Sequence, residues 1–240
     1  MNVMDAFAAS CRSFDTEDVA RQYREQDELI FLRDFVPAPE LGAMVAESRE
    51  LVRVAHRSYS PLRRKGGAVG QSAIRRDAPT LDALYRSPAM LAWAESLAGC
   101  ELTYKDEHDE HAAAIYTYTR PGDHVAWHYD DCGCGGAASY TATLGLVHDT
   151  RARAQYKLFG KDGRATRLLS LRMDPGSFLF FCGSKPEHRV TPLHRGEERI
   201  VFSFAFVKPG RVPRGKARFL ENLKDAFAYF GPKALLQKNY

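Results

Sequence analysis

The stretch Gly-Asp-His-Val-Ala-Trp-His-Tyr-Asp-Asp, residues 122–131, is the part of the sequence from which both fold and site are predicted. In an extended strand successive side chains point to opposite faces, so His128 and Asp130 share a face and Tyr129 points away. A histidine and a carboxylate on one face are typical metal ligands. With eight histidines in the chain, a lone His-x-Asp pair often arises by chance. Its meaning therefore depends on the surrounding sequence.

A second histidine, His188, follows the apolar segment Gly-Ser-Phe-Leu-Phe-Phe, residues 176–181, and a Gly-Ser turn. Two histidines and one carboxylate on one side of a metal leave three positions open, which is the arrangement of non-heme Fe(II) oxygenases. We therefore predict that His128, Asp130 and His188 bind a metal and that catalysis takes place there.

An arginine is expected on the inward face of the last strand. Arg199 begins Arg-Ile-Val-Phe-Ser-Phe-Ala-Phe, residues 199–206, in which Arg199 and Ser203 alternate with large apolar side chains. A guanidinium on an inward face needs an anion. The sequence leaves open whether that anion is a bound carboxylate or an internal Asp or Glu. Ser203 and Tyr118 are candidate hydroxyl donors to a bound anion, although Tyr118 is equally consistent with a core residue.

Short strand-like segments dominate the second half of the chain. Turn signals with Gly, Pro or Asp separate them, and they cover residues 113–119, 139–147, 155–159, 167–172, 177–182 and 199–207. Helical periodicity in the first hundred residues followed by these strands predicts an α+β fold, a double-stranded β-helix (jelly roll, cupin-like) with N-terminal helices packed on the major sheet. We expect one domain over residues 1–240, made of a helical layer at 1–100, a jelly-roll core at 101–207 and a C-terminal segment at 208–240.

Several boundaries in the first hundred residues follow from capping patterns. Asp15 precedes a helix start, and Ser87-Pro88 with Gly99 marks the two ends of another helix. A strand is expected at 29–35, and further helices at about 39–55 and 219–229. Residues 1–14 are predicted to be an irregular lead-in. Residues 57–78, which mix Ser, Arg, Lys, Gly and Pro, are predicted to be a long loop of the kind that often serves as a lid.

The composition limits the class of protein. Of the 240 residues 45% are hydrophobic, which is enough for one substantial core. A formal net charge of +4, a pI of about 8.8 and no extended basic and aromatic groove predict no nucleic-acid partner. An odd count of five cysteines without a secretory leader indicates a cytoplasmic location, and no run approaches the roughly 18 apolar residues of a membrane helix. Cys132 and Cys134 lack the paired spacing of a zinc site and are expected in a flexible turn.

The order of these motifs resembles a known superfamily. His128-x-Asp130, then His188, then Gly196 and Arg199 before an aromatic-rich strand are similar to the Fe(II)/2-oxoglutarate-dependent oxygenases over about residues 101–207. The resemblance implies that His128, Asp130 and His188 hold Fe(II), that 2-oxoglutarate chelates the iron, and that Arg199 pairs with its distal carboxylate. It also implies that O2 is consumed and that a substrate C–H bond is hydroxylated.

A narrower resemblance concerns the substrate. Asp-Glu-His-Asp-Glu-His, residues 106–111, and Trp-His-Tyr-Asp, residues 127–130, look like the group of halogenases and hydroxylases that act on free lysine and related amino acids. In the halogenases of that group a glycine replaces the carboxylate of the triad and frees a position for chloride. This chain has Asp130 there, so the resemblance implies a hydroxylase.

Relatives that act on lysine imply positions for substrate contacts. An acidic residue and a histidine upstream of the metal histidine and an acidic residue after the triad correspond by position to Glu110, His124 and Asp131. The alternatives are a solvated acidic loop for Glu110 and a turn-capping role for Asp131. Arg63 or Arg64 in the long loop is a further candidate, as a partner of the substrate carboxylate.

Three functions remain open at this stage. The first is a hydroxylase of a small molecule, with a free amino acid such as lysine as the leading substrate. The second stays in the superfamily and hydroxylates a protein or peptide, or demethylates a nucleic acid. The third is a jelly-roll binding module without catalysis. The sequence carries no signal for oligomeric state.

Overall fold

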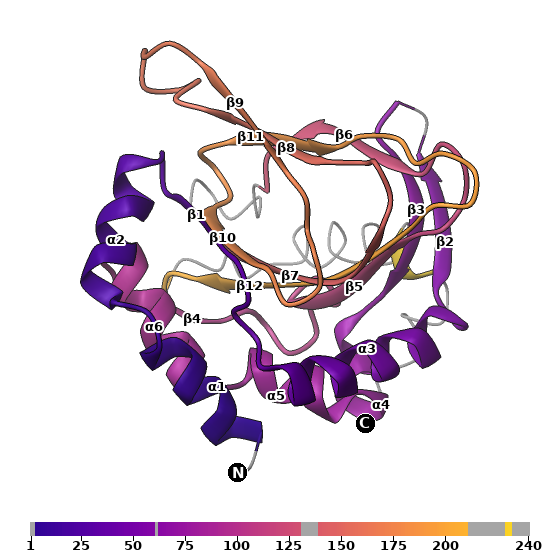
Figure 1. The fold of residues 1–240 in the computed structure, drawn as a ribbon, viewed down its shortest axis with the longest axis horizontal. Coiled ribbons are helices and arrows are strands. Elements are labelled where there is room, and N and C mark those ends of the chain that lie inside the picture. Colours follow the sequence, from indigo (N-terminus) through magenta and orange to yellow (C-terminus); the bar gives the residue numbers. More distant parts are fainter. Residues whose placement is uncertain (1–2, 61, 131–138, 211–228, 232–240) are drawn as a thin grey trace.

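The computed structural model of the chain describes residues 3–60, 62–130, 139–210 and 229–231, and its fold is a double-stranded β-helix with a layer of helices on one side (Figure 1). The helices are α1 (Val3–Arg12), α2 (Thr16–Glu25), α3 (Ala38–Val52), α4 (Gln71–Asp77), α5 (Pro79–Tyr85) and α6 (Pro88–Ala98). The strands are β1 (Leu29–Leu32), β2 (His56–Ser60), β3 (Arg64–Val69), β4 (Thr103–Tyr104), β5 (Ala113–Tyr118), β6 (His124–His128), β7 (Ser139–Asp149), β8 (Ala154–Leu158), β9 (Arg167–Leu171), β10 (Phe178–Cys182), β11 (Glu187–Val190) and β12 (Glu198–Val207).

The strands form one curled sheet in the order β1-β10-β7-β12-β5-β3-β6-β11-β8-β9, with β2 paired to β3 and β4 to β12. Because β3 pairs with both β5 and β6, it joins the two layers of the barrel. In Figure 1 the strands β6, β8, β9 and β11 lie across from β5, β7, β10 and β12, and the helices cover the outer side of the latter set. Residues on the inner faces of both layers therefore face a common interior.

The side chains of β12 alternate between two hydrophobic clusters, one on each face of the strand. Its outward residues Phe202, Phe204 and Phe206 are fully buried against the helices, in the same cluster as Tyr85 and Trp93. Burial of an aromatic side chain of this kind contributes about 1.5–3 kcal/mol. On the inner face, Val201 joins Tyr156 and Phe181 in a second, smaller cluster inside the barrel.

The helix ends follow the predicted capping. The Asp15 carboxylate accepts the backbone N–H groups of Glu17 and Asp18 at the start of α2. The Ser87 hydroxyl accepts the N–H of Met90 at the start of α6, and α6 ends at Gly99 with φ of 65°, a left-handed conformation that glycine adopts readily.

The expected loop at residues 57–78 is wrong. The segment holds the hairpin of β2 and β3 and then helix α4. The glycines that contributed to the loop prediction allow close packing of strands instead. A Cβ on Gly67 would lie 2.5 Å from Cγ2 of Thr117, so only glycine lets β3 lie against β5 at this point.

The N-terminal segment is helical, contrary to prediction. Residues 1–14 are not an irregular lead-in, because Val3–Arg12 form α1, in which Phe7 and Cys11, one helical turn apart, are buried against the other helices. The expected helix at 219–229 lies almost entirely outside the described residues. Among those described, no helix has both the length and the apolar character needed to cross a membrane.

Candidate metal centre

The two histidines of the predicted triad meet through strand pairing. β6 and β11 are antiparallel, and His128 is the direct partner of His188 across the two strands. Directly opposed residues project from the same face, so both imidazoles point into the barrel, with ring centroids 4.1 Å apart. Residues that are distant in the sequence are thus adjacent because of the sheet register.

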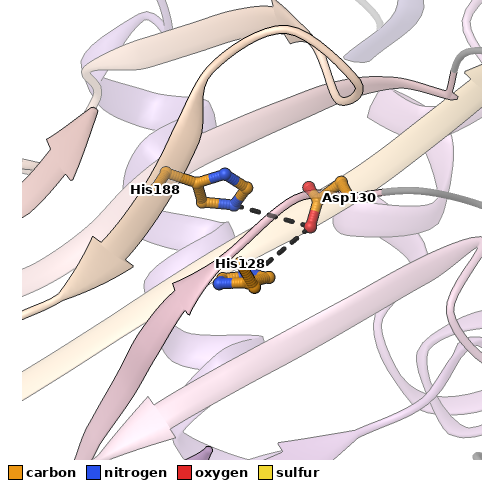
Figure 2. A group of neighbouring side chains, drawn as sticks. All are labelled: His128, Asp130 and His188. Carbon is orange, nitrogen blue, oxygen red and sulfur yellow. Dashed lines mark ion pairs between the residues drawn. The ribbon is translucent and has the colours of Figure 1, made fainter. Parts of the chain in front are cut away.

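Asp130 completes the cluster from the segment after β6. Its backbone N–H donates to the carbonyl of Gly183 at 3.0 Å, which fixes the chain at this point. Its Oδ1 lies 3.4 Å from Nε2 of His128 and 3.5 Å from Nε2 of His188 (Figure 2). A metal with ligand bonds of about 2 Å holds neighbouring ligand atoms roughly 3 Å apart, so the three side chains need only a small contraction around one ion.

Backbone carbonyls orient both imidazoles. Nδ1 of His128 lies 2.9 Å from the carbonyl of Ala126, and Nδ1 of His188 lies 3.2 Å from that of Pro186. A carbonyl accepts only, so each Nδ1 carries a proton, and each Nε2 faces Asp130 as the ring nitrogen that a metal would bind. The two rings are therefore oriented with Nε2 toward the position that a metal would take.

A hydroxyl on β7 holds the other oxygen of the carboxylate. Thr141 Oγ1 donates to Oδ2 of Asp130 at 2.9 Å, which leaves Oδ1 for the metal. Thr141 was not among the predicted site residues, although the sequence places a threonine on the inner face of a predicted strand there. Hydrogen bonds of this kind to a ligand hold its orientation.

The charges of the three groups support one another. Burial by itself would raise the pKa of Asp130, but the imidazoles of His188 and His128 hold that pKa well below its usual range. Burial would lower the pKa of His128, yet its hydrogen bond and charge interaction with Asp130 leave that pKa raised.

Aromatic side chains pack against His188 on one side of the site. Tyr156 stacks on His188 with ring centroids 5.2 Å apart, and Phe181 packs edge-on against the imidazole.

Arg199 lies inside the barrel, as expected. Its side chain is buried, with 3% of the residue exposed, and its guanidinium carbon Cζ lies 5.1 Å from the ring centroid of Tyr118. Nε and Nη1 have no hydrogen-bond partner among the described residues. An internal Asp or Glu, the alternative that the sequence left open, forms no salt bridge with it in the described part of the chain. Ser203 is on the same face of β12, but its hydroxyl is bonded to the carbonyl of Ala142 and to Thr143 on β7.

His124 does not lie beside the metal site, contrary to expectation. Strict alternation places His124 and His128 on one face, but the pairing of β6 with β11 shifts by one residue between them. Val125, not His124, is the partner of Val190, and both pack in the barrel interior against Tyr118. The bulge therefore turns His124 to the other face.

Glu110 has a structural role that the sequence analysis did not assign. Its carboxylate accepts the backbone N–H and the hydroxyl of Ser72, at the N-terminus of α4. Both oxygens are thus occupied by a helix start, where a negative charge is stabilised. The expected contact between Glu110 and substrate is not supported by this arrangement.

Arg64 lies in the interior, and the strand around it replaces the expected loop. It is 3% exposed on β3, opposite Val125 of β6. Its guanidinium lies 5.1 Å from the ring centroid of Tyr116 and 4.3 Å from that of Tyr229. Nη2 donates to the carbonyl of Gly67, whereas Nε and Nη1 have no partner among the described residues. Asp131 lies outside the described residues.

Comparison with known proteins identifies the family to which this chain belongs. The profile of a family described as Halogenase D matches residues 12–135, slightly more than half of the chain. The chain belongs to the Halogenase D family. The matched region contains His128 and Asp130 and ends before His188 and Arg199. The comparison with curated proteins found no match.

Solved structures resemble this member of the Halogenase D family in fold. The epimerase SnoN, solved with Fe3+, alpha ketoglutarate and nogalamycin RO, has a TM-score of 0.66 at 18% identity, over 84% of this chain and 88% of that one. A prolyl hydroxylase from Trichoplax adhaerens, solved with a peptide fragment of hypoxia inducible factor, has a TM-score of 0.66 at 12% identity, over 83% and 90%. A prolyl-4-hydroxylase from Pseudomonas putida has a TM-score of 0.59 at 16% identity, over 81% and 100%. The predicted jelly roll is confirmed.

The donor set of this Halogenase D family member fits iron and a diacid. Two imidazoles and one carboxylate within 4.8 Å of one another are compatible with Fe(II), which this triad typically binds with open positions for further ligands. The guanidinium of Arg199 is buried, and two of its nitrogens lack partners in the described ranges, which is compatible with the distal carboxylate of 2-oxoglutarate. The solved proteins of this fold include an epimerase and hydroxylases, so the reaction has to be argued from residues of this chain.

Proposed function

We propose that this chain is an Fe(II)- and 2-oxoglutarate-dependent hydroxylase of a small molecule, with a free amino acid such as lysine as the leading substrate. The observation that carries the proposal is the complete triad. Asp130 Oδ1 faces both histidines, so the carboxylate occupies the position that a glycine leaves to chloride in the halogenases that this sequence resembles. Three protein ligands favour hydroxylation over halogenation within the Halogenase D family.

The cofactors supply the oxidation. When bound, iron, 2-oxoglutarate and O2 replace a substrate C–H by C–OH and release succinate and CO2. The protein contributes orientation and exclusion of water. His128, Asp130 and His188 would hold the iron, and Arg199 would pair with the distal carboxylate of 2-oxoglutarate from the inner face of β12.

Arg64 is the proposed partner of the substrate carboxylate. It reaches the barrel interior beside Tyr116, and two of its guanidinium nitrogens are without partners among the described residues. A buried guanidinium with free donors is suited to bind an anion bidentately. Asp131, next to the metal ligand Asp130, is proposed to meet the cationic group of the substrate.

The experiment starts with binding. Anaerobic addition of Fe(II) and then 2-oxoglutarate to the purified protein should produce the visible charge-transfer band of a chelated 2-oxo acid. His128→Ala, which removes one ligand, should lose iron binding and the band. A wild-type protein that binds no iron would show that the triad does not form a metal site, and the binding-module alternative would then stand.

Turnover identifies the substrate class. Succinate release is measured over the free amino acids, lysine first, and the product is expected to gain the mass of one oxygen atom. Arg64→Leu should raise the KM for the amino acid much more than it changes the affinity for 2-oxoglutarate. Succinate release that requires a peptide or a nucleic acid would assign the chain to the second alternative. Gain of chlorine in place of oxygen would contradict hydroxylation.

A further inference from the structure

In the described part of the chain, a histidine inside the barrel has no hydrogen-bond partner for either ring nitrogen. His148, near the end of β7, is 8% exposed, and both Nδ1 and Nε2 lack hydrogen bonds among the described residues. Buried polar groups are nearly always hydrogen-bonded, because burial removes their water. An imidazole in this state indicates a binding partner that the described residues do not provide.

His148 is the strand neighbour of Arg199. In the sheet Arg199 on β12 stands directly opposite His148 on β7 and directly opposite Tyr118 on β5. Opposed residues share a face with Cβ atoms about 5 Å apart, so the three side chains form a row on the inner face. Nε and Nη1 of Arg199 are also without hydrogen-bond partners among the residues that the structure describes. Two adjacent buried side chains thus present unsatisfied nitrogens in the same place.

The other charged groups near His148 are already paired. Arg172 and Arg153 interact with it electrostatically, but Arg172 donates to Asp174 at 3.0 Å and Arg153 donates to the carbonyls of Arg151 and Ala152. Among the described arginines near His148, Arg199 is therefore the one with buried unpartnered nitrogens. The unsatisfied nitrogens in this part of the structure thus lie together, on His148 and Arg199.

The imidazole of His148 is neutral. Burial is the main cause, the positive charges of Arg199, Arg172 and Arg153 add to it, and Asp174 opposes it, so the pKa of His148 is lowered to about 4. A neutral imidazole has one N–H donor and one acceptor nitrogen. Beside a carboxylate that already pairs with Arg199, it would donate its N–H to the second oxygen.

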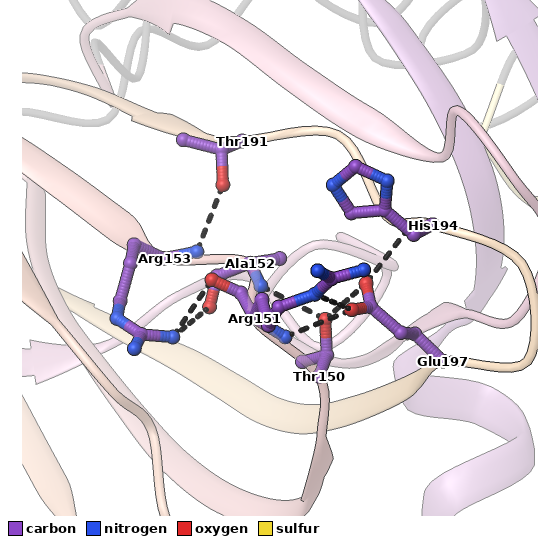
Figure 3. A network of polar contacts seen from close by, with 7 residues as sticks. All are labelled: Thr150, Arg151, Ala152, Arg153, Thr191, His194 and Glu197. Atoms are coloured by element: carbon purple, nitrogen blue, oxygen red, sulfur yellow. Dashed lines mark hydrogen bonds and ion pairs between the residues drawn. The ribbon is translucent and has the colours of Figure 1, made fainter.

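A polar network fixes the ends of the two strands that carry the pair (Figure 3). Thr150 lies two residues after His148, and Glu197 lies two residues before Arg199. The Glu197 carboxylate accepts the Thr150 hydroxyl at 2.8 Å and the N–H groups of Arg151 and His194 at 3.1 and 2.7 Å. These bonds join the ends of β7 and β12, and a rigid support of this kind is what an anion site requires.

We propose that His148 is a second binding residue for the distal carboxylate of 2-oxoglutarate, beside Arg199. The inference rests on the proposed function, since it assumes that the bound anion is the cosubstrate. It goes beyond the predicted site residues, which place Arg199, Ser203 and Tyr118 around that anion. His148 takes the role expected of Ser203, whose hydroxyl is bonded within the sheet.

The test compares two 2-oxo acids by binding. Affinities of 2-oxoglutarate and 2-oxobutyrate, which lacks only the distal carboxylate, are measured anaerobically by calorimetry and by the charge-transfer band. The proteins are wild type, His148→Leu and His148→Gln, each loaded with Fe(II) and checked for an unchanged Tm. Leucine removes the donor at similar volume, and glutamine keeps an N–H donor.

We expect His148→Leu to weaken 2-oxoglutarate binding about tenfold and to leave 2-oxobutyrate binding unchanged. His148→Gln should recover most of the loss. Equal loss for both acids, or no loss for either, would overturn the proposal, since it would show that His148 only fills space. A wild-type protein that binds iron but neither acid would instead overturn the proposed function, so the two failures are distinguishable.

Discussion

Replacement of Gly183 with alanine is expected to weaken iron binding and to destabilise the fold. A Cβ at this position would lie 2.5 Å from the backbone oxygen of Asp130 and 2.7 Å from its Cβ. Ordinary contacts of a Cβ begin at about 3.4 Å, so the two segments must separate by roughly 1 Å. Ligands have to stay within about 0.2 Å of their metal distances, and overpacking of this kind costs about 1–3 kcal/mol in stability.

The assay is an anaerobic Fe(II) titration of Gly183→Ala beside wild type, with unfolding followed in urea. Displacement of the metal ligand Asp130 should reduce iron affinity about 10- to 100-fold, the range found when the support of a metal ligand is lost. Gly160→Ala is the matched control, because nothing lies within 4 Å of a Cβ at Gly160. Iron affinity of Gly183→Ala equal to that of wild type would show that Asp130 is not held against Gly183 as described.

Three further perturbations test other parts of the structure. Thr141→Val removes the hydroxyl that donates to Asp130 and should weaken iron binding about tenfold in the same titration, with an unchanged Tm. Gly67→Ala should destabilise the protein by about 1–3 kcal/mol in urea unfolding, and an added Thr117→Ser, which removes the clashing methyl group, should restore part of the loss. Partial burial of Glu197 would raise its pKa, but hydrogen bonds from His194, Arg151 and Thr150 lower it from 4.5 to about 2. The stabilisation by Glu197 is therefore complete above pH 4.5 and lost as the pH falls toward 2, so the difference in unfolding free energy between wild type and Glu197→Gln should shrink over that interval.

The His128–Asp130 pair of the metal cluster could be predicted because its geometry is local. His128 and Asp130 are two residues apart, and over that distance alternation of side chains holds in almost any extended segment. Arg199 was found in the same way, from the contrast between its face of β12 and the aromatic face. Each of these predictions required only the alternation of side chains along one strand, and no information about the strands that pair with it.

The wrong predictions concern positions where the pairing of two strands interrupts the two-residue alternation of side chains. The bulge between β6 and β11 turns His124 away from the site, and the shift in the pairing of β7 with β12, between Ile200 and Val201, brings His148 to the inner face. Strict alternation from Thr141 would have placed His148 outside. An extra residue in a strand depends on its partner strand, so a single sequence gives little sign of it. Glu110 escaped correct assignment for a related reason, because its partner Ser72 lies on a helix that was expected to be a loop.

Packing against the helices sets the register on which the proposed anion site depends. Phe202 and Phe204 are buried in the helical core, and their positions on β12 place Arg199 on the opposite, inner face. A slip of β12 by one residue would bring the guanidinium into that aromatic core and leave a phenylalanine inside the barrel. The loss of buried aromatic area and the burial of an unpaired charge would both oppose the slip. The outer apolar face therefore holds Arg199 beside His148, although none of its aromatic side chains enters the barrel.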